Sequence, residues 1–445
     1  MGTRIREEFE DADFGDERLN RRLVRLGEAL AEDPAESLPQ SLDDAALEAA
    51  YRFLNNESVS PVAILAPHVR ETLRRIDGGT VLAVHDTTQF GFRADGKRRG
   101  LGHLRSTQRF FSHVTLAVRP GENREPLGVI GAHNFIEPKG AEKRWLDQAL
   151  ETSKLFDHKN VVHVMDREGD GFATIAGLLE ANARFVIRAC DHRLIATVDG
   201  ATRIRNAVDG FATVTTREVP ISSRTNTGRN PRKRKQFPAR NMRVATLQIS
   251  AKRVTLKRPG SQPVTLPATC EVNIIRAWEP NAPDNEAPVE WLLLTTEPID
   301  SADDLLATID MYRARWRIEE LFKAVKTGCG FEKRQLESYE ALVNALAVYL
   351  PIAWRMLHLR SQTIEAPDSN VTLLDPTELE VLRRKARRPL PANPTRRDVL
   401  LAIAGLGGHL KHNGEPGWQT LGKGLERLLG LVEGYKLACP GSDQS

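Results

Sequence analysis

The stretch NVVHVMDREGDGFATIAGLLEANARFVIRA, residues 160–189, decides the fold of this chain. It begins with an apolar, valine-rich run bounded by polar residues, and this pattern predicts a buried strand over 160–166. A short helix is expected over 171–182, and RFVIRA (184–189) predicts a second strand. A helix that connects two neighbouring strands of one sheet leaves them parallel. The stretch therefore predicts an α/β sheet covered by helices.

Three further strands are expected before this stretch. The segments TVLAVHDTT (80–88), RFFSHVTLAV (109–118) and PLGVIGAHNFI (126–136) are apolar and rich in β-branched residues, and the turn-like RPGEN joins the last two. A helix is expected over 141–156. The resulting order β-β-β-α-β-α-β combines a hairpin with a helical crossover, which predicts a mixed sheet flanked by helices.

The second half of the chain opens with a strand-rich segment over about 197–288, which we interpret as a β insertion. The segment EWLLLTTEP (290–298) then predicts another buried strand. Residues 300–328 are expected to form one long helix, with Asp300 or Ser301 as its N-cap.

Both ends of the chain are expected to be helical. Residues 14–65 contain amphipathic helices with arginines largely off an apolar stripe, which is formed by Leu19, Leu23, Leu26 and Leu30. Ser41 is the expected N-cap of the second of these helices. Basic amphipathic helices suit DNA binding, although a solvated face on a small bundle is the commoner interpretation. We expect an apolar helix over 341–359, a polar linker over 361–378 and helices again from about 394 to 435.

The overall composition is typical of a soluble globular protein, with 40% hydrophobic and 27% charged residues. At 445 residues the chain is too long for one ordinary domain. The net charge of only +4 means that any nucleic-acid signal must come from local clusters. No apolar run approaches the roughly 20 residues of a membrane span, and the N-terminus has no apolar signal region, so we expect a cytoplasmic protein without a membrane partner. The four cysteines lack the spacing of a zinc site or a disulfide framework.

Residues 224–243 form a strongly basic segment without an acidic residue. Its cationic residues are Arg224, Arg229, Arg232, Lys233, Arg234, Lys235, Arg240 and Arg243. Contact with a phosphate backbone is the natural use of such a cluster. A merely solvated loop is the alternative, and the lack of counter-charges favours the nucleic acid.

Two aspartates stand where predicted strands end. Asp86 closes VLAVHD and Asp166 closes VVHVMD, and ligands and metal ions collect at strand ends of such sheets. Either residue alone is more often a turn former or a helix N-cap. His85 precedes Asp86, and because adjacent strand residues face opposite sides, we expect His85 in the core or behind the site.

The segment YRARWRIEELFKAVK, residues 312–326, carries a third carboxylate. At about 100° per residue, one stripe of this helix collects the polar residues Tyr312, Arg315, Glu319, Lys323 and Lys326. The other side is expected to be buried through Ala314, Ile318, Leu321 and Val325. Glu320 lies off the polar stripe. A surface ladder of ion pairs is the alternative interpretation, because Arg315, Glu319 and Lys323 follow i, i+4, i+8 spacing.

Asp86, Asp166 and Glu319 would repel one another if they met without divalent cations. Oxygen ligands without a Cys or His set suit Mg²⁺ or Mn²⁺. Two such ions beneath a phosphodiester would activate a nucleophile and stabilise the leaving oxygen. Arginine and lysine would hold phosphates, and tryptophan or tyrosine would stack on bases.

This arrangement resembles the RNase H-like DDE transposases, which have an Asp on a first strand, an Asp after a fourth and a Glu on a later helix beyond a β insertion. The spacing Tyr312-x₂-Arg315-x₃-Glu319-x₆-Lys326 is similar to the YREK signature of bacterial cut-and-paste transposases of insertion-sequence family four, of the transposon Tn-five type. Agreement extends over nearly the whole chain through HDTT (85–88), DREGDG (166–171), RFVIR (184–188), EWLLLTTEP (290–298), AYRFLNN (50–56) and the segment 405–434.

The resemblance implies the fold class: an α/β, RNase H-like mixed sheet flanked by helices, with a β-strand insertion and helical N- and C-terminal domains. The implied limits are 1–74 for a DNA-binding domain, 75–365 for the catalytic domain with its insertion at about 197–288, and 366–445 for a dimerisation domain. The implied cofactor is a pair of Mg²⁺ ions, for which Mn²⁺ substitutes, held by Asp86, Asp166 and Glu319.

The resemblance also implies the DNA contacts. Transposon-end phosphates near the cut would be held by Tyr312, Arg315 and Lys326, with Lys323 as a helper. Trp291 matches a position that stacks on a flipped-out base, with a buried core tryptophan as the alternative. Arg188 matches a DNA-contacting arginine, although the following Ala-Cys-Asp-His is less basic than the family pattern. The basic segment adds Arg232, Lys233, Arg234 and Lys235. The implied partners are double-stranded transposon-end and target DNA and a second copy in a homodimer.

The implied reaction is a nick at each transposon end, hairpin formation by the freed 3′-OH, reopening by water and joining of the 3′ ends to target DNA. One alternative is a metal-dependent nuclease of the same fold that cuts without joining, which strand-transfer products would separate. The other is a catalytically weak, transposase-derived DNA-binding regulator. The presence of all three acidic residues and of an N-terminal helical region argues against this regulator.

Overall fold

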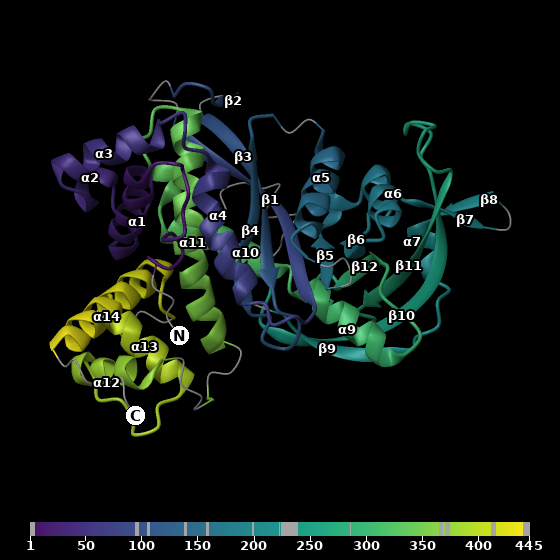
Figure 1. Cartoon of the computed structure of the whole chain (residues 1–445). Helices are drawn as coiled ribbons and strands as arrows, with labels where there is room; N and C mark the ends of the chain where they lie inside the picture. The colour runs from purple at the N-terminus through teal and green to yellow at the C-terminus, as the bar shows by residue number, and fades with distance from the viewer. Residues whose placement is uncertain are drawn as a thin grey trace. The chain divides into compact units, whose positions relative to one another are not determined.

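A computed structural model of the chain describes residues 5–93, 98–104, 107–137, 140–156, 160–197, 200–221, 223, 239–284, 286–364, 368–369, 374–410 and 415–438 (Figure 1). The chain divides into two compact units. The first unit is Met1–Lys139 together with Trp316–Ser445, and the second unit is Gly140–Arg315. The expected three-domain limits stay a prediction.

The sheet of the first unit is antiparallel. It contains β1 (Val81–Arg93), β2 (Gly102–Leu104), β3 (Thr107–Val118) and β4 (Pro126–Phe135), in which β1, β2 and β4 all pair with β3. The three strands predicted here are confirmed, and β2 is additional. β1 runs for 13 residues because β3 pairs with it along its whole length, from Leu82↔Val118 to Arg93↔Thr107. Asp86 therefore lies inside a strand, opposite Val114, and the expectation that it ends one is wrong.

Helices precede this sheet, as predicted. They are α1 (Glu17–Glu32), α2 (Leu38–Ser41), α3 (Asp44–Leu54) and α4 (Pro61–Arg74). The leucine stripe of α1 is buried. Ser41 is the last residue of α2, and the N-cap of α3 is Asp43, whose carboxylate accepts the Ala46 N–H at 2.8 Å. The expected cap at Ser41 is therefore wrong by two residues, because Asp43 provides an equally good acceptor closer to the helix.

A buried hydrogen bond between a carboxylate and a histidine ties the N-terminal segment to α4 and β4. The side chains of Glu8 and His68 are both 0% exposed, and His68 Nδ1 lies 2.5 Å from a Glu8 carboxylate oxygen. The Val129 N–H donates to His68 Nε2 at 2.9 Å. Since Nε2 accepts, the ring is neutral and its proton sits on Nδ1, facing Glu8. The second carboxylate oxygen of Glu8 binds Arg75.

The C-terminal part of the first unit is helical. It contains α11 (Tyr339–Ile364), α12 (Pro376–Lys385), α13 (Arg396–Leu406) and α14 (Trp418–Ala438). The last three lie side by side around one apolar cluster (Figure 1). α11 is long and apolar enough to cross a membrane by length and composition, which sequence inspection overlooked, but 94% of the 18-residue window concerned is buried. Such burial is typical of the central helix of a protein core.

The second unit contains a mixed sheet in the order β5-β6-β12-β11-β10-β7-β8, with β9 paired to β10. Its strands are β5 (Val161–Met165), β6 (Arg184–Arg188), β7 (Leu194–Thr197), β8 (Gly200–Arg203), β9 (Thr215–Ile221), β10 (Arg243–Lys257), β11 (Thr269–Trp278) and β12 (Glu290–Thr295). β5 and β6 are parallel, and the other neighbours are antiparallel. The prediction from residues 160–189 is confirmed. The strands of the β insertion continue this sheet, because β10 and β11 follow β12.

Helices cover this second sheet. They are α5 (Ala141–Ser153), α6 (Phe172–Glu180), α7 (Ile204–Val208) and α9 (Ala302–Arg313). Trp145 of α5 and Phe172 of α6 belong to one apolar cluster with Ile187 of β6 and Leu294 of β12. α9 contacts β5 and β6. The parallel pair thus lies beneath helices, as a β-α-β unit requires.

Candidate active site and DNA contacts

The helix expected over 300–328 is interrupted. α9 ends at Arg313, a two-residue turn follows, and α10 (Trp316–Lys323) continues into a π-helical turn over Ala324–Gly328. At the turn the Arg315 N–H donates to Tyr312 O at 3.0 Å, a tighter i→i+3 bond. Residues 301–327 contain no glycine or proline, so propensity favours an unbroken helix. The N-cap expectation is confirmed at Ser301, which accepts the Asp304 N–H at 3.2 Å.

The interruption removes the predicted five-residue polar stripe. Tyr312 and Arg315 belong to the second unit, and Glu319, Lys323 and Lys326 to the first. Tyr312 is also only 5% exposed, with its ring 5.6 Å from that of Trp291 in an edge-on contact. The prediction of the buried side is confirmed, since the residues at 0% exposure include Ala314, Ile318, Leu321 and Val325.

Asp86 and Lys326 lie near each other in the first unit. Burial lowers the pKa of the Lys326 amine, while the charges of Glu332 and Asp86 oppose this shift. Lys326 Nζ also lies 5.4 Å from the ring centroid of Phe90. One oxygen of Glu332 accepts the Gly91 N–H of β1 at 2.8 Å. Sequence reasoning missed Glu332, because only the fold places it beside β1.

Glu319 is partly buried on α10, and α10 packs against β1, the strand of Asp86. Lys323 is exposed, with Nζ 5.5 Å from the Trp316 ring. Glu320, which helix geometry puts off the polar stripe, forms an ion pair with Arg317 at 2.9 Å. These three acidic or basic positions of α10 therefore have distinct surroundings.

His85 is a core residue, as expected. Its side chain is 0% exposed, and Nδ1 lies 3.1 Å from Thr115 Oγ1 of the neighbouring strand. Its ring stacks on that of His113, with centroids 5.8 Å apart. Because His85 and Asp86 are adjacent in β1, their side chains leave opposite faces of the strand.

Asp166 directly follows β5 in the second unit, so its predicted place at a strand end is confirmed. It caps the short 3₁₀ helix Arg167–Gly169 by accepting the Glu168 N–H at 2.8 Å. Burial and, to a smaller degree, the negative charge of Asp166 raise the pKa of Glu168. Asp170 is buried and lies 2.7 Å from Arg193, so it has a structural partner.

Arg188 contacts Glu290, the residue that precedes Trp291 in β12. Arg188, the last residue of β6, donates to the Glu290 carbonyl at 3.2 Å. The Glu290 carboxylate accepts from Arg276 at 2.9 Å and also binds Arg205. Trp291 is partly exposed, whereas the three leucines after it are buried, so the interpretation as a fully buried core tryptophan is wrong. The three arginines hold the start of β12, and sequence spacing gave no signal for this cluster.

The basic cluster Arg232, Lys233, Arg234 and Lys235 lies outside the described residues. At the edge of that segment, Arg243 is bound by Glu279 and by Glu286 at 2.6 Å. The hydrogen bonds that Arg243 donates to these two carboxylates raise its pKa. Arg243 is thus part of a structural ion cluster, and its assignment to a phosphate-binding run is not supported by its contacts.

The donor set of the three candidate acids consists only of carboxylate oxygens, which are ligands that Mg²⁺ and Mn²⁺ prefer. Asp86 and Glu319 belong to the first unit and Asp166 to the second. Among the residues that the structure describes, no group of three or more His, Cys, Asp or Glu side chains is arranged to hold a metal ion. Carboxylate oxygens suit such a cation. That the three acids come together around it is part of the proposed function.

Comparison with known proteins identifies two regions of the chain. A family described as transposase DNA-binding matches residues 1–59, and a family described as transposase DDE domain matches residues 77–352. A cryo-EM structure of the piggyBac transposase synaptic complex with hairpin DNA is 10% identical and has a TM-score of 0.36, with 96% of this chain and 74% of that chain covered. The DDE domain match extends over more than half of the residues. The chain therefore belongs to the DDE transposases, and its substrate is DNA.

Proposed function

We propose that this protein is a cut-and-paste DNA transposase of insertion-sequence family four, of the YREK-signature, Tn-five type. The observation that carries the proposal is the DDE domain match over 77–352, which spans Asp86, Asp166 and Glu319. The YREK spacing within the same region supports the narrower assignment. An RNase H-like catalytic core, the limits 1–74, 75–365 and 366–445, and a cytoplasmic location belong to the same proposal.

The three acids would hold two Mg²⁺ ions, for which Mn²⁺ substitutes. When bound, these ions would activate the attacking oxygen and stabilise the leaving one. The ordered position of Asp86 within β1 and the short α10 that carries Glu319 supply rigid carriers for two of the ligands. Asp166 contributes from the end of β5. Lys326, held beside Asp86, would neutralise a phosphate near the cut.

The remaining side chains would bind and orient the DNA. Arg188, Arg315 and Lys323 would contact end phosphates, and the basic cluster at 232–235 would contact the backbone further away. Tyr312 is buried against Trp291, so we assign it a supporting role for that ring in addition to any phosphate contact. Trp291 would stack on the flipped base beside the hairpin. Two copies would bridge two ends, which makes the working form a homodimer.

The test uses the purified full chain, Mg²⁺ or Mn²⁺ and a labelled duplex carrying the terminal repeats that flank its gene. We expect nicks, then hairpins, then strand-transfer products on a denaturing gel. Cleavage without hairpins or joining would establish the nuclease alternative. Binding without cleavage would establish the DNA-binding regulator.

Trp291→Ala is expected to reduce hairpin formation by about 10- to 100-fold while nicking stays near the wild-type rate. The reason is that base stacking on an aromatic ring is worth about 1–3 kcal/mol, and only the hairpin step needs the flipped base. The measurement is the ratio of hairpin to nicked product over time. Trp291→Phe is the matched control, because it keeps an aromatic face. Equal loss of nicking and hairpins in both variants would contradict the assigned role.

A further inference from the structure

We infer that Arg317 is a positioning residue that fixes α10, and with it the Glu319 carboxylate, against the turn between β3 and β4. This inference rests on the proposed function, because it assigns Arg317 a role in the reaction of Glu319. The evidence consists of the hydrogen bonds of Arg317 and of the contacts that fix the turn between β3 and β4.

α10 depends on sideways contacts for its orientation. It has only eight residues, follows a two-residue turn and ends in the π-helical turn Ala324–Gly328. An uninterrupted α-helix would take its rotation from the residues before and after it, whereas the turn before α10 and the change to π-helical bonds after it both alter that rotation. The side chains that hold α10 from its sides therefore determine the direction of the Glu319 side chain.

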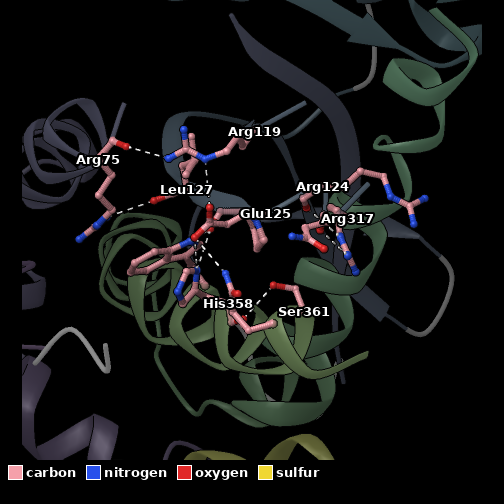
Figure 2. Close-up of polar contacts among 12 residues, drawn as sticks. Arg75, Arg119, Arg124, Glu125, Leu127, Arg317, His358 and Ser361 are labelled. Atoms are coloured by element: carbon pink, nitrogen blue, oxygen red, sulfur yellow. Dashed lines mark hydrogen bonds and ion pairs between the residues drawn. The ribbon is translucent and has the colours of Figure 1, made fainter. Parts of the chain in front are cut away.

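Arg317 provides such a sideways contact. Its side chain is 7% exposed, and it donates from Nε to the Arg124 carbonyl and from a terminal nitrogen to the Asn123 carbonyl, both at 3.1 Å (Figure 2). The other terminal nitrogen binds Glu320 at 2.9 Å. The planar fork of a guanidinium suits two consecutive carbonyls, which a lysine amine cannot match. Arg317 thus joins α10 to one turn through two parallel bonds.

The turn that receives Arg317 is anchored on one side by Arg119. This arginine binds Asp77 at 2.8 Å and Glu125 at 3.1 Å, and it donates to the Arg75 carbonyl at 3.2 Å. Figure 2 shows Arg119 and Arg75 converging on the start of β4. Arg75 also donates to the Leu127 carbonyl at 3.2 Å. The base of the turn is therefore fixed to the end of α4.

α11 anchors the same turn from another side. Trp354 Nε1 donates to the Pro126 carbonyl at 2.8 Å, and His358 Nδ1 lies 3.2 Å from that oxygen. Gln362 donates to the Glu125 carboxylate at 3.0 Å. Arg124 sits at the centre with φ of 39°, a left-handed conformation that is costly for a residue other than glycine. Strain of this kind persists only where surrounding contacts over-determine the backbone.

Arg317 and Glu319 leave α10 in different directions. At about 100° per residue, positions two apart differ by roughly 200°, so the two side chains lie on nearly opposite sides of the helix. The hydrogen bonds of Arg317 on one side of α10 therefore set the rotation of the helix, and this rotation determines the direction of the Glu319 side chain on the opposite side. Loss of these hydrogen bonds would turn or loosen α10 without removing any group that touches DNA.

The experiment compares wild type with Arg317→Lys and Arg317→Gln, using the full chain and the labelled end duplex. We expect single-turnover nicking to fall by about 10- to 100-fold, as for other residues that orient a metal ligand, with the dissociation constant for end DNA within about twofold of wild type. The second measurement is Mn²⁺ binding to the protein–DNA complex by electron paramagnetic resonance, which needs no turnover. A weakening of about tenfold is expected there.

Two controls separate positioning from general packing. Arg258→Lys changes an arginine of the second unit that likewise donates to two backbone carbonyls, those of Val264 and Leu266, and it should leave nicking unchanged. Glu320→Gln removes only the ion pair of Arg317 and should also leave nicking unchanged. If Glu320→Gln lost as much nicking activity as Arg317→Lys, the hydrogen bonds from Arg317 to the two carbonyls would not be what positions α10.

The outcomes also separate this inference from the proposed function. Nicking and Mn²⁺ binding at wild-type level in both Arg317 variants, with an active wild type, would overturn the inference alone. Absence of nicking in the wild type itself would overturn the proposed function. If Arg317→Gln does not fold, Arg317→Lys decides the matter, because it keeps the positive charge beside Glu320 and removes only the forked geometry.

Discussion

Glu319→Gln is expected to abolish nicking at transposon ends, with a loss of at least about 10³-fold, while the affinity for end DNA stays unchanged. Glutamine keeps the size of the side chain but removes the negative charge that a divalent cation requires. Residues that act as one catalytic unit each cause losses of this order when replaced singly. The measurement is the single-turnover rate of nicking on a denaturing gel, beside a gel-shift titration with the same duplex.

Glu320→Gln is the matched control for this prediction. It changes the neighbouring carboxylate, which binds Arg317 and lies off the polar side of α10. Asp86→Asn and Asp166→Asn should behave like Glu319→Gln, because all three acids are proposed to hold the same pair of ions. Equal cleavage by wild type and Glu319→Gln would mean that Glu319 belongs to a surface ladder of ion pairs and that the third ligand lies elsewhere.

Glu8→Gln is expected to lower the free energy of unfolding by about 3–5 kcal/mol, the usual effect of removing one partner of a buried ion pair. Glu8 accepts from the neutral His68 ring and also binds Arg75, and its side chain is 0% exposed. A glutamine would leave the Arg75 charge without its buried partner. Urea unfolding followed by tryptophan fluorescence measures the effect. Glu28→Gln, in an exposed pair with Arg6, is the control and should cost less than about 1 kcal/mol.

Glu8 and His68 also make the free energy of unfolding decrease at low pH. Burial lowers the pKa of His68 despite the nearby Glu8 carboxylate. Burial raises the pKa of Glu8, but the hydrogen bond from His68 and the charge of Arg75 outweigh it, so the net shift is downward. In both cases the unfolded chain binds protons that the folded chain does not, so stability rises with pH. The contribution of His68 is present above its ordinary pKa of about 6.5 and is lost as pH falls below it.

The loss from Glu8 follows at lower pH. It begins below the ordinary glutamate pKa of about 4.3, as the pH approaches the lowered pKa of the folded state. Unfolding titrations at pH 7, 6, 5, 4 and 3 should show this two-step decline in the wild type, and the second step should be smaller in Glu8→Gln. A stability that increases toward pH 5 would contradict the neutral His68 assignment.

Local patterns in the sequence were sufficient for the elements that periodicity governs. The leucines of α1 and the apolar side of α10 recur at helical spacing, and both sets are buried. The strands and crossover helix of residues 160–189 are confirmed, and Asp166 follows β5 as expected. Each of these features depends on neighbours a few residues away, so the sequence alone contains the necessary information.

Features that depend on distant partners were decided only by the tertiary structure. β1 continues past Asp86 because β3 pairs with it, and the long helix breaks after Arg313 although no residue there disfavours helix. Arg317 binds carbonyls from 193 and 194 residues earlier in the chain, and His68 meets Glu8 across 60 residues. The sequence by itself determined the buried sides of α1 and α10, the parallel strand pair and the identity of the candidate acids. The lengths of the elements and the groups that hold Glu319 and His68 in place were decided by packing between distant segments, because burial and hydrogen bonding act between residues that no local pattern connects.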